Sequence, residues 1–457
     1  MNDQTAVREL TPSQREGCAL LERVLTGALL ASALFLGTIS LVFTWTIIGV
    51  DAPVEYRENA VVFTTELLVA GENPYDLEHQ PLFINAYGLG YHWIVLPLAR
   101  HWGSGFLVHR AVSALFVILS CAVLFCGLYR TAVSWPLALA AAVLWLIHLS
   151  RGLSIVARPD SFGMFLFLLS VLIPGLWEFA PWSLSLSLIL GTLGLLTKPY
   201  FVFGIPCLAT YLFLFRGKRL GVRYAVSGLL LTGATVAVMH ARFPYYLTNT
   251  VVINVNVAGK SFAHLQRIAA EYQQAHVGVV MILVWAIVIS LICGVERLRQ
   301  DRAGTTAHPW VNFRDPGKPL LGFSLGLMPF MLLCGVLVMI AVMGRHHGND
   351  ILYYDQLISP FLYWVVTTQM QRLSALKIPC LILLLSTLWT SPQALVHAPI
   401  VRDKEWNVLE GLIARHHHVF ASPPLAHILR RQGKPVYNTG QTEFFIHGAR
   451  NNVRQLS

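Results

Sequence analysis

Residues 24–50 have the sequence VLTGALLASALFLGTISLVFTWTIIGV, an apolar stretch without a single charged side chain. A helix that crosses the hydrocarbon core of a bilayer needs about 20 such residues, with a range of roughly 17–25. The stretch is too long for a signal sequence and lacks a small-residue cleavage site, so we interpret it as a retained first transmembrane helix. It predicts a helical membrane protein.

The same pattern recurs along the chain, which predicts about eleven transmembrane helices and an all-α polytopic fold. A shorter apolar patch, Tyr87–Leu98, suits an interfacial or re-entrant segment. The tenth stretch is the shortest of those that we expect to cross the membrane. The charge-free stretches after the first are Ala111–Tyr129, Thr131–Ile147, Ser161–Trp177, Phe179–Thr197, Pro199–Phe215, Tyr224–Met239, Val277–Val295, Leu320–Met343, Leu357–Gln371 and Ile378–Val396.

The composition agrees with a membrane location. Of the 457 residues, 55% are hydrophobic and 12% are charged, against roughly 25% charged residues in an ordinary soluble domain. The mean hydropathy is +0.59. These values exclude a soluble enzyme, a disordered chain and a secreted disulfide scaffold. The seven cysteines lie in the N-terminal tail or inside predicted helices, so they imply no disulfide framework.

The net charge of +10 reflects the placement of Lys and Arg in the loops on one side of the membrane, and does not indicate nucleic-acid binding. Lys and Arg are enriched in every second loop except the one at Glu178, and this bias places the N-terminus in the cytoplasm. The first loop, residues 51–110, and the tail from His397 then lie on the outer face. We expect a transmembrane module over residues 1–396 and a small outer α/β segment over 397–457. Within the outer parts we expect interfacial helices at Tyr56–Ala70 and in Ala241–His276, and a strand, a helix and a strand at 418–422, 424–432 and 434–438.

Ionisable groups gather on this outer face, where we expect a functional site. Asp51 ends the first helix, and two further acids follow it. Lys198 stands alone between two apolar stretches. The complete set of candidates is Asp51, Glu55, Glu58, Arg158, Asp160, Lys198, Lys260, Arg267, Arg345, His346, His347, Asn349 and Tyr353.

Such a set offers a carboxylate base for an acceptor hydroxyl and cations for a phosphate leaving group, as glycosyl transfer from a lipid-phosphate sugar requires. Each residue also has an ordinary structural explanation. Asp51 could be an interfacial charge, Arg158-Pro159-Asp160 could be a helix cap, and Lys198 could extend to the interface. The run His416–His418 resembles a metal cluster, but adjacent histidines do not converge on one ion.

Several short motifs resemble the GT-C superfamily of polytopic glycosyltransferases, which includes protein O-mannosyltransferases and lipid A aminoarabinose transferases. An acidic residue opens a large outer loop after a long first helix. The motifs that follow are Gly71-Glu72-Asn73-Pro74-Tyr75-Asp76, the aromatic-rich Asn85–Pro97, Arg110, Ala157-Arg158-Pro159-Asp160, Leu196-Thr197-Lys198, and His347–Asn349 with Tyr353-Tyr354.

The resemblance implies a GT-C-like bundle in a bacterial plasma membrane that transfers a hexosyl or pentosyl group from a polyprenyl-phosphate carrier, with inversion. The acceptor would be an extracytoplasmic glycan, lipid or protein. Asp51 would act as base, Asp160 would position the acceptor or a divalent metal ion, and Lys198 and Arg345 would face the donor phosphate. Many members have adjacent Asp and Glu at the start of the first loop. Here Ala52-Pro53-Val54 separate Asp51 from Glu55, so Glu55 and Glu58 stay candidates for the base.

Two other classes of function are compatible with a polytopic chain. A secondary transporter or a lipid-linked-sugar flippase would show internal repeats and polar groups near the bilayer midplane. Here the charged groups lie in loops on one face, and no two-fold repeat is found. A non-catalytic membrane subunit would not need Asp51, Asp160 and Lys198 on one side.

Overall fold

The structure is a computed structural model. It describes isolated positions between 266 and 288 together with residues 12–55, 57–76, 85–151, 154–252, 319–338, 356–372, 374–390, 403–416, 428–429 and 432–434. Within these ranges the chain forms helices joined by turns and contains no strand. The predicted all-α class is therefore confirmed for the described residues.

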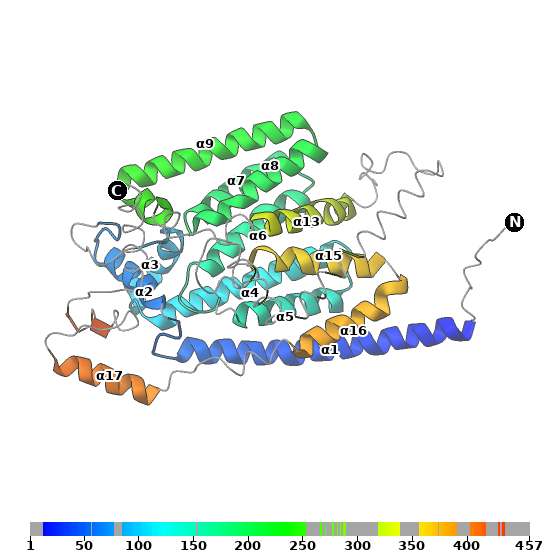
Figure 1. Cartoon of the computed structure of the whole chain (residues 1–457), viewed down its shortest axis with the longest axis horizontal. Coiled ribbons are helices and arrows are strands. Elements are labelled where there is room, and N and C mark those ends of the chain that lie inside the picture. Colours follow the sequence, from blue (N-terminus) through cyan, green and yellow to red (C-terminus); the bar gives the residue numbers. More distant parts are fainter. Residues whose placement is uncertain are drawn as a thin grey trace.

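Ten of the eleven predicted apolar stretches coincide with helices of the described part (Figure 1). The remaining stretch, Val277–Val295, lies outside the fully described residues. The helices are α1 (Pro12–Gly49), α4 (Phe106–Arg130), α5 (Trp135–Arg151), α6 (Asp160–Leu176), α7 (Pro181–Leu195), α8 (Gly204–Phe215) preceded by the 3-10 turn η1 (Pro199–Phe203), α9 (Lys218–Arg242), α13 (Pro319–Val338), α15 (Ser359–Arg372) and α16 (Ser374–Thr390).

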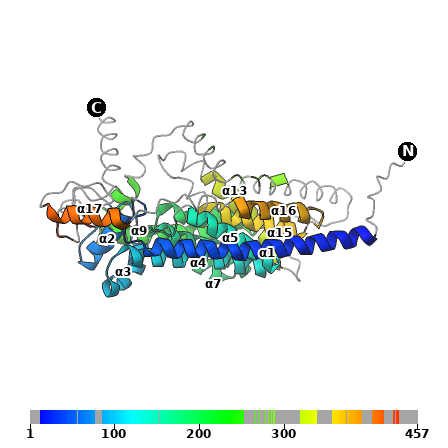
Figure 2. The same ribbon diagram turned by 90° about the horizontal axis from the view of Figure 1, so that it is seen from below.

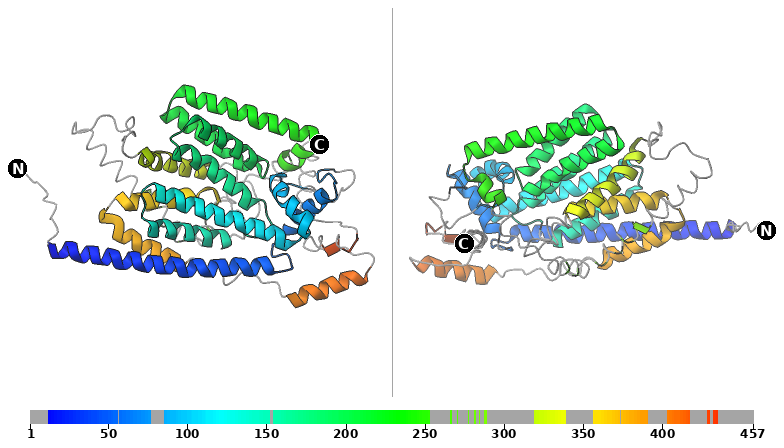
Figure 3. Two further views of the ribbon diagram at one scale, coloured as in Figure 1. Left: turned by 180° about the vertical axis from the view of Figure 1, so that it is seen from behind. Right: turned by 45° about the horizontal axis from the view of Figure 1, so that its top comes forward.

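Consecutive helices run in alternating directions, so the turns between them collect at two ends of the bundle (Figures 1 and 3). The N-terminal end of α1 lies at one end. Two shorter helices, α2 (Glu58–Val69) and α3 (Gly90–Trp102), lie at the other. This second end is called the α2–α3 end below. It carries the first-loop acids, as the loop order predicts.

Three described helices are long and apolar enough to cross a membrane, by length and composition: Glu16–Gly49 within α1, α4 and α9. The apolar helices α5, α6 and α7 have 15–17 residues. At 1.5 Å per residue they rise about 22–26 Å, less than the roughly 30 Å of a bilayer core. By contrast, α1 extends past its apolar part and exposes Glu16.

Aromatic side chains of α15 form part of the core of the bundle, which explains how the shortest predicted stretch forms a stable helix. Phe361, Tyr363 and Trp364 are fully buried. The Trp364 ring lies so close to Gly127 of α4 that a Cβ there would come within 2.5 Å of it. A short helix buried on all sides needs no amphipathic pattern, because its neighbours supply the apolar surroundings.

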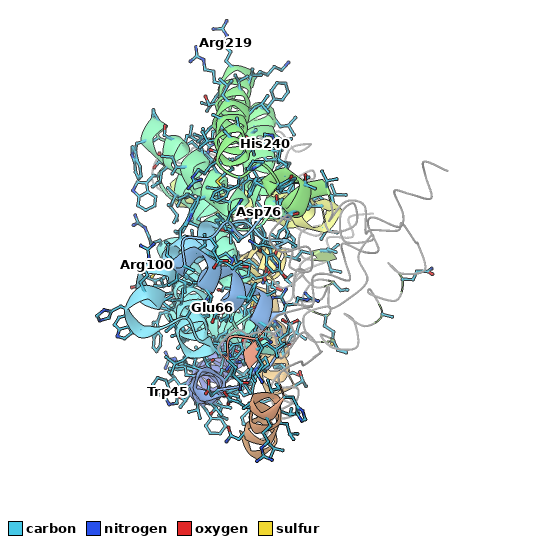
Figure 4. All side chains as sticks on the ribbon, turned by 90° about the vertical axis from the view of Figure 1, so that its left-hand side faces the viewer. Trp45, Glu66, Asp76, Arg100, Arg219 and His240 are labelled. Carbon is cyan, nitrogen blue, oxygen red and sulfur yellow. The ribbon has the colours of Figure 1, made fainter. Side chains whose placement is uncertain are left out.

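The helix expected at Tyr56–Ala70 is present as α2, but it is buried on both sides, whereas an interfacial helix is buried on one. Its residues from Glu58 to Thr65, and Leu67, are buried. The sequence pattern placed apolar groups on one side and acids on the other. Packing against α3 and α4 and an internal ion pair bury both sides. Figure 4 looks onto this end, with Glu66 between Trp45 of α1 and His240 of α9.

The C-terminal part contributes α17 (Asp403–Arg415), a helix that the sequence patterns did not predict. It lies beside the α2–α3 end (Figures 1 and 2). Most of the predicted strand–helix–strand segment lies outside the described residues. Its described positions are Ile428 and Leu429, which are helical, and Gln432–Lys434.

Candidate functional site

Glu58 and Arg110 form a buried ion pair at the centre of the α2–α3 end. Both side chains are fully buried. The Arg110 Nε donates to Glu58 Oε1, and Nη2 donates to Oε2, each at 2.8 Å. This bidentate geometry is the strongest that Arg and a carboxylate adopt. Removing water from both charges is costly, so the pair persists only because its remaining hydrogen bonds are also made.

Arg110 uses its other N–H groups to hold the end of the first helix. Nη1 donates to the carbonyls of Ile47 (3.1 Å) and Val50, and Nη2 donates to the carbonyl of Ala52 at 2.5 Å. The last carbonyls of a helix lack intrahelical donors. One guanidinium from α4 therefore fixes the path of the chain on both sides of Asp51.

Glu58 in turn connects the first loop to the loop before α6. Its carboxylate accepts the backbone N–H groups of Val54 (2.6 Å), Glu55 (3.2 Å) and Ala157 (2.8 Å). Ala157 directly precedes Arg158-Pro159-Asp160. The Glu58–Arg110 pair thus joins the two acidic loops that the sequence singles out.

The three first-loop acids that are candidates for the base have different surroundings. Glu58 is buried and accepts hydrogen bonds from five N–H groups. Glu55 is nearly buried, accepts the Arg57 backbone N–H and pairs with the Arg57 guanidinium at 3.3 Å. Asp51 is exposed, and its carboxylate pairs with no residue of the described part. Of the three, Asp51 is the one open to a solvent-borne partner.

A second buried cluster is centred on Asp160, the first residue of α6. Lys198 Nζ donates to both oxygens, at 2.7 and 2.8 Å. The Tyr200 hydroxyl donates to Oδ1 at 2.8 Å, and Arg158 Nε lies 3.0 Å from Oδ2. Asp160, Arg158 and Lys198 are each at most 3% exposed. The sequence predicted these three residues as site candidates, and the structure brings them together.

The turn that carries Lys198 is built by close backbone contact with residues 85–90. Gly88 N–H donates to the carbonyl of Thr197, and Gly90 N–H donates to that of Leu196. A Cβ at Gly88 would lie 1.9 Å from the Leu196 carbonyl oxygen, so only glycine fits. The missing side chain of Gly88 therefore allows the two backbones to come into contact.

The motif Gly71–Asp76 acts on the site through an aromatic contact. The Tyr75 hydroxyl donates to the carbonyl of Tyr87 at 2.6 Å, and Lys198 Nζ lies 4.6 Å from the centre of the Tyr87 ring. An ammonium group over an aromatic ring is attracted by the negative face of the ring. Tyr75 thus fixes the residue that covers Lys198.

Gln356 completes the cluster and was missed by the sequence analysis. Its side chain is fully buried, and its Oε1 lies 3.4 Å from the Tyr200 hydroxyl. Its Nε2 has no hydrogen-bond partner in the described part of the chain. A buried N–H donor without an acceptor is costly. One sequence feature could have identified Gln356. It directly precedes the apolar stretch Leu357–Gln371, at the same end of the bundle as the other polar residues of the site.

The surroundings of Asp160 do not fit a divalent metal ion. Its two oxygens already accept from Lys198 and Tyr200 and face Arg158. An added cation would meet two existing positive charges at short range. No group of three or more His, Cys, Asp or Glu residues that could hold a metal ion occurs among the described residues.

The remaining sequence candidates lie outside the described residues. They are Lys260, Arg267, Arg345, His346, His347, Asn349 and Tyr353.

Neither a protein-family model nor a curated protein matches this sequence. Two solved structures are similar to the chain, both of ArnT from Cupriavidus metallidurans. The apo structure is 15% identical, covers 92% of this chain and 88% of that chain, and gives a TM-score of 0.47. The structure bound to undecaprenyl phosphate has the same identity and coverage and a TM-score of 0.45.

Proposed function

We propose that this protein is a membrane glycosyltransferase that transfers a sugar from a polyprenyl-phosphate carrier to a hydroxyl-bearing acceptor. The observation that carries the proposal is the Asp160 cluster. Two cations, a tyrosine hydroxyl and Gln356 Nε2 converge there, at the same end of the bundle as the exposed Asp51. Gln356 Nε2 has no hydrogen-bond partner among the described residues. The GT-C-like motifs of the sequence support the same reaction class.

The cluster is suited to the phosphate of the donor. Lys and Arg carry three and five N–H donors respectively, and phosphate oxygens accept such donors strongly. Gln356 Nε2 would gain an acceptor when a phosphate approaches Tyr200. Before the sugar donor binds, the ion pairs with Asp160 keep Lys198 and Arg158 in place. In a dry, preorganised site these groups stabilise the charge of a departing phosphate far better than water does.

Asp51 is the carboxylate that fits the role of general base. A base must reach the acceptor hydroxyl and must have a free oxygen to take its proton. Exposure gives Asp51 both properties. Glu58 has neither, because it is fully buried and saturated with N–H donors.

The reaction would proceed by direct displacement. The acceptor oxygen attacks the anomeric carbon while Asp51 takes its proton. The bond between that carbon and the phosphate oxygen breaks, and its electron pair leaves with the phosphate. Lys198 and Arg158 stabilise the negative charge that develops, and attack from the opposite side inverts the anomeric centre.

Lipid extraction tests this proposal. Deleting the gene should make the cell accumulate a polyprenyl-phosphate sugar, detected by mass spectrometry. The wild-type chain should clear this lipid, whereas Asp51→Asn and Lys198→Met, expressed at wild-type levels, should not. Removing one charge-stabilising donor typically lowers kcat by about 10²–10³-fold. Glu16→Gln, which changes an exposed acid near the N-terminal end of α1, is the control and should clear it.

Two results would contradict the proposal. One is clearance of the lipid by both site variants. The other is a deletion strain with an unchanged lipid profile whose vesicles lose uptake of a solute, which would favour a transporter.

A further inference from the structure

We infer that the C-terminal segment around α17 positions the loop that carries Asp51, and so forms part of the catalytic unit. The inference rests on the proposed function for the role of Asp51. It joins two parts of the chain that the sequence places in separate modules, residues 1–396 and 397–457.

The contact is an apolar cluster between the first outer loop and the last described residues. Val50 and Ala52 lie in it together with Ile413, Ile428 and Leu429. Ala52 is fully buried, and Ile428 and Leu429 are each 2% exposed. Figures 1 and 2 show α17 beside the end of α1, where this loop begins. The C-terminal segment thus covers the two residues that flank Asp51.

The segment has a defined geometry at this contact. Lys434 Nζ donates to the carbonyls of Ile413 and His416, which lie at the C-terminal end of α17. Gln432 Nε2 donates to the carbonyl of Glu410 at 3.2 Å. A cation at the last carbonyls of a helix satisfies groups that lack intrahelical donors. These bonds place Gln432 and Lys434 against α17, and the bond to the Ile413 carbonyl holds Ile413 in its buried position.

Side chains of α17 with described burial show a single contact face. Ile413 is 5% exposed, whereas Val408 and Leu412 are 62% and 45% exposed. Ile413 is therefore the residue through which the helix reaches the loop. Val408 and Leu412 provide control positions on the same helix.

The Asp51 loop is held from two sides. Arg110 binds the carbonyls of Val50 and Ala52 from within the bundle, and the C-terminal cluster packs on their side chains. Asp51 lies between them and is exposed. Arg110 fixes the backbone path of the loop. Without the C-terminal segment, however, one face of the loop would be exposed to solvent. Small displacements of a reacting group lower rates strongly, by about 10²-fold for roughly 1 Å.

Cysteine protection tests the contact without any assumption about activity. Ala52→Cys in the full-length chain should be protected from a water-soluble maleimide. Adding Ile413→Ala should raise its labelling rate at least about tenfold, whereas adding Val408→Ala should not change it. The parent chain without the Ala52→Cys change gives the background of the native cysteines. Equal protection of the thiol in all three backgrounds would overturn the docking.

Kinetics test the positioning role, with the polyprenyl-phosphate sugar purified from the deletion strain as donor. Ile413→Ala should lower kcat about tenfold and leave KM for the donor within twofold, because the donor phosphate binds elsewhere. Ile413→Val should restore most of kcat. Lys434→Met should lower kcat as Ile413→Ala does, and it replaces Ile413→Ala in the test if the alanine variant folds poorly. Val408→Ala should behave as wild type.

The outcomes separate the two proposals. A wild-type kcat in Ile413→Ala and Lys434→Met, or a rise of KM without a fall of kcat, would overturn the positioning role while leaving the glycosyltransferase proposal intact. A wild-type protein that transfers no sugar would end the glycosyltransferase proposal. The labelling result would then still decide whether the C-terminal segment docks on this loop.

Discussion

The carboxylate of Glu58 receives five N–H groups from α4, from its own loop and from the loop before α6. An acid in this position organises the site rather than reacting in it. Because all of its lone pairs are directed at donors, replacing this carboxylate would break several bonds at once. The same surroundings make the residue a sensitive point for stability.

Glu58→Gln should destabilise the protein by about 3–5 kcal/mol, because it leaves the Arg110 charge buried without its counter-ion. Unfolding in detergent micelles measures the loss. Glu16→Gln, at an exposed position of α1, makes the same chemical change and should alter the free energy of unfolding by less than about 0.5 kcal/mol. An unchanged unfolding midpoint in Glu58→Gln would contradict the structural role.

His92 predicts a pH dependence of stability. It lies in α3, which is not among the helices long enough to span a membrane. Its Nδ1 is 2.8 Å from the Thr65 hydroxyl. Burial lowers the pKa of His92 from 6.5 to about 3, so between these values the unfolded chain binds a proton that the folded chain does not. Stability contributed by the neutral ring is present above pH 6.5 and is lost as the pH falls towards 3, by at most about 1.4 kcal/mol per pH unit.

Unfolding midpoints of wild type and His92→Asn between pH 7 and pH 4 check this expectation. The wild-type midpoint should fall more steeply with acid than that of the variant. Parallel curves for the two proteins would show that His92 does not titrate on unfolding.

At the scale of elements, the contact between residues 85–90 and the Lys198 turn is set by two glycines. Gly88→Ala should force the two backbones apart, because the new Cβ would overlap the Leu196 carbonyl oxygen. We expect a loss of donor-lipid clearance together with a lower unfolding midpoint. Gly27→Ala is the matched control, since nothing lies within 4 Å of its Cβ position in α1, and alanine favours a helix by up to about 1 kcal/mol. Equal behaviour of the two variants would contradict the close packing.

The helices of the bundle could be predicted because a membrane-spanning segment must be continuously apolar, and that property is local in sequence. Stretches such as Ser161–Trp177 and Phe179–Thr197 agree with α6 and α7 within a few residues at each end. The burial of α2 could not be predicted in this way. Its surroundings come from α3 and α4, and its acid is neutralised by an arginine 52 residues further along the chain.

The candidate site was predictable in part for the same reason. Asp160, Arg158 and Lys198 stood out because charges are rare beside apolar helices, and they do converge. Gln356 carries no charge, and Tyr87 resembles any interfacial aromatic residue, so neither stood out. Among the first-loop acids, residue type alone did not separate Asp51 from Glu58, because the difference lies in their partners.

For the whole molecule, the two ends of the bundle predict which residues a membrane-impermeant reagent reaches. Cys18 is exposed near the N-terminal end of α1, and Glu72 is exposed at the α2–α3 end. In intact cells a thiol from Glu72→Cys should be labelled, whereas Cys18 should react only after the membrane is permeabilised. Labelling of Cys18 from outside would reverse the orientation that the Lys and Arg distribution predicts.

The packing of Ile413 on Val50 and Ala52 has a consequence for biosynthesis. The two partners are separated by about 360 residues of chain. At about 5–20 residues per second, on the order of 20–70 s pass between the synthesis of one and that of the other. During this time the bundle is inserted while the loop around Asp51 lacks its final cover. The nascent chain therefore completes this corner only after the described helices α1 to α16 have been made.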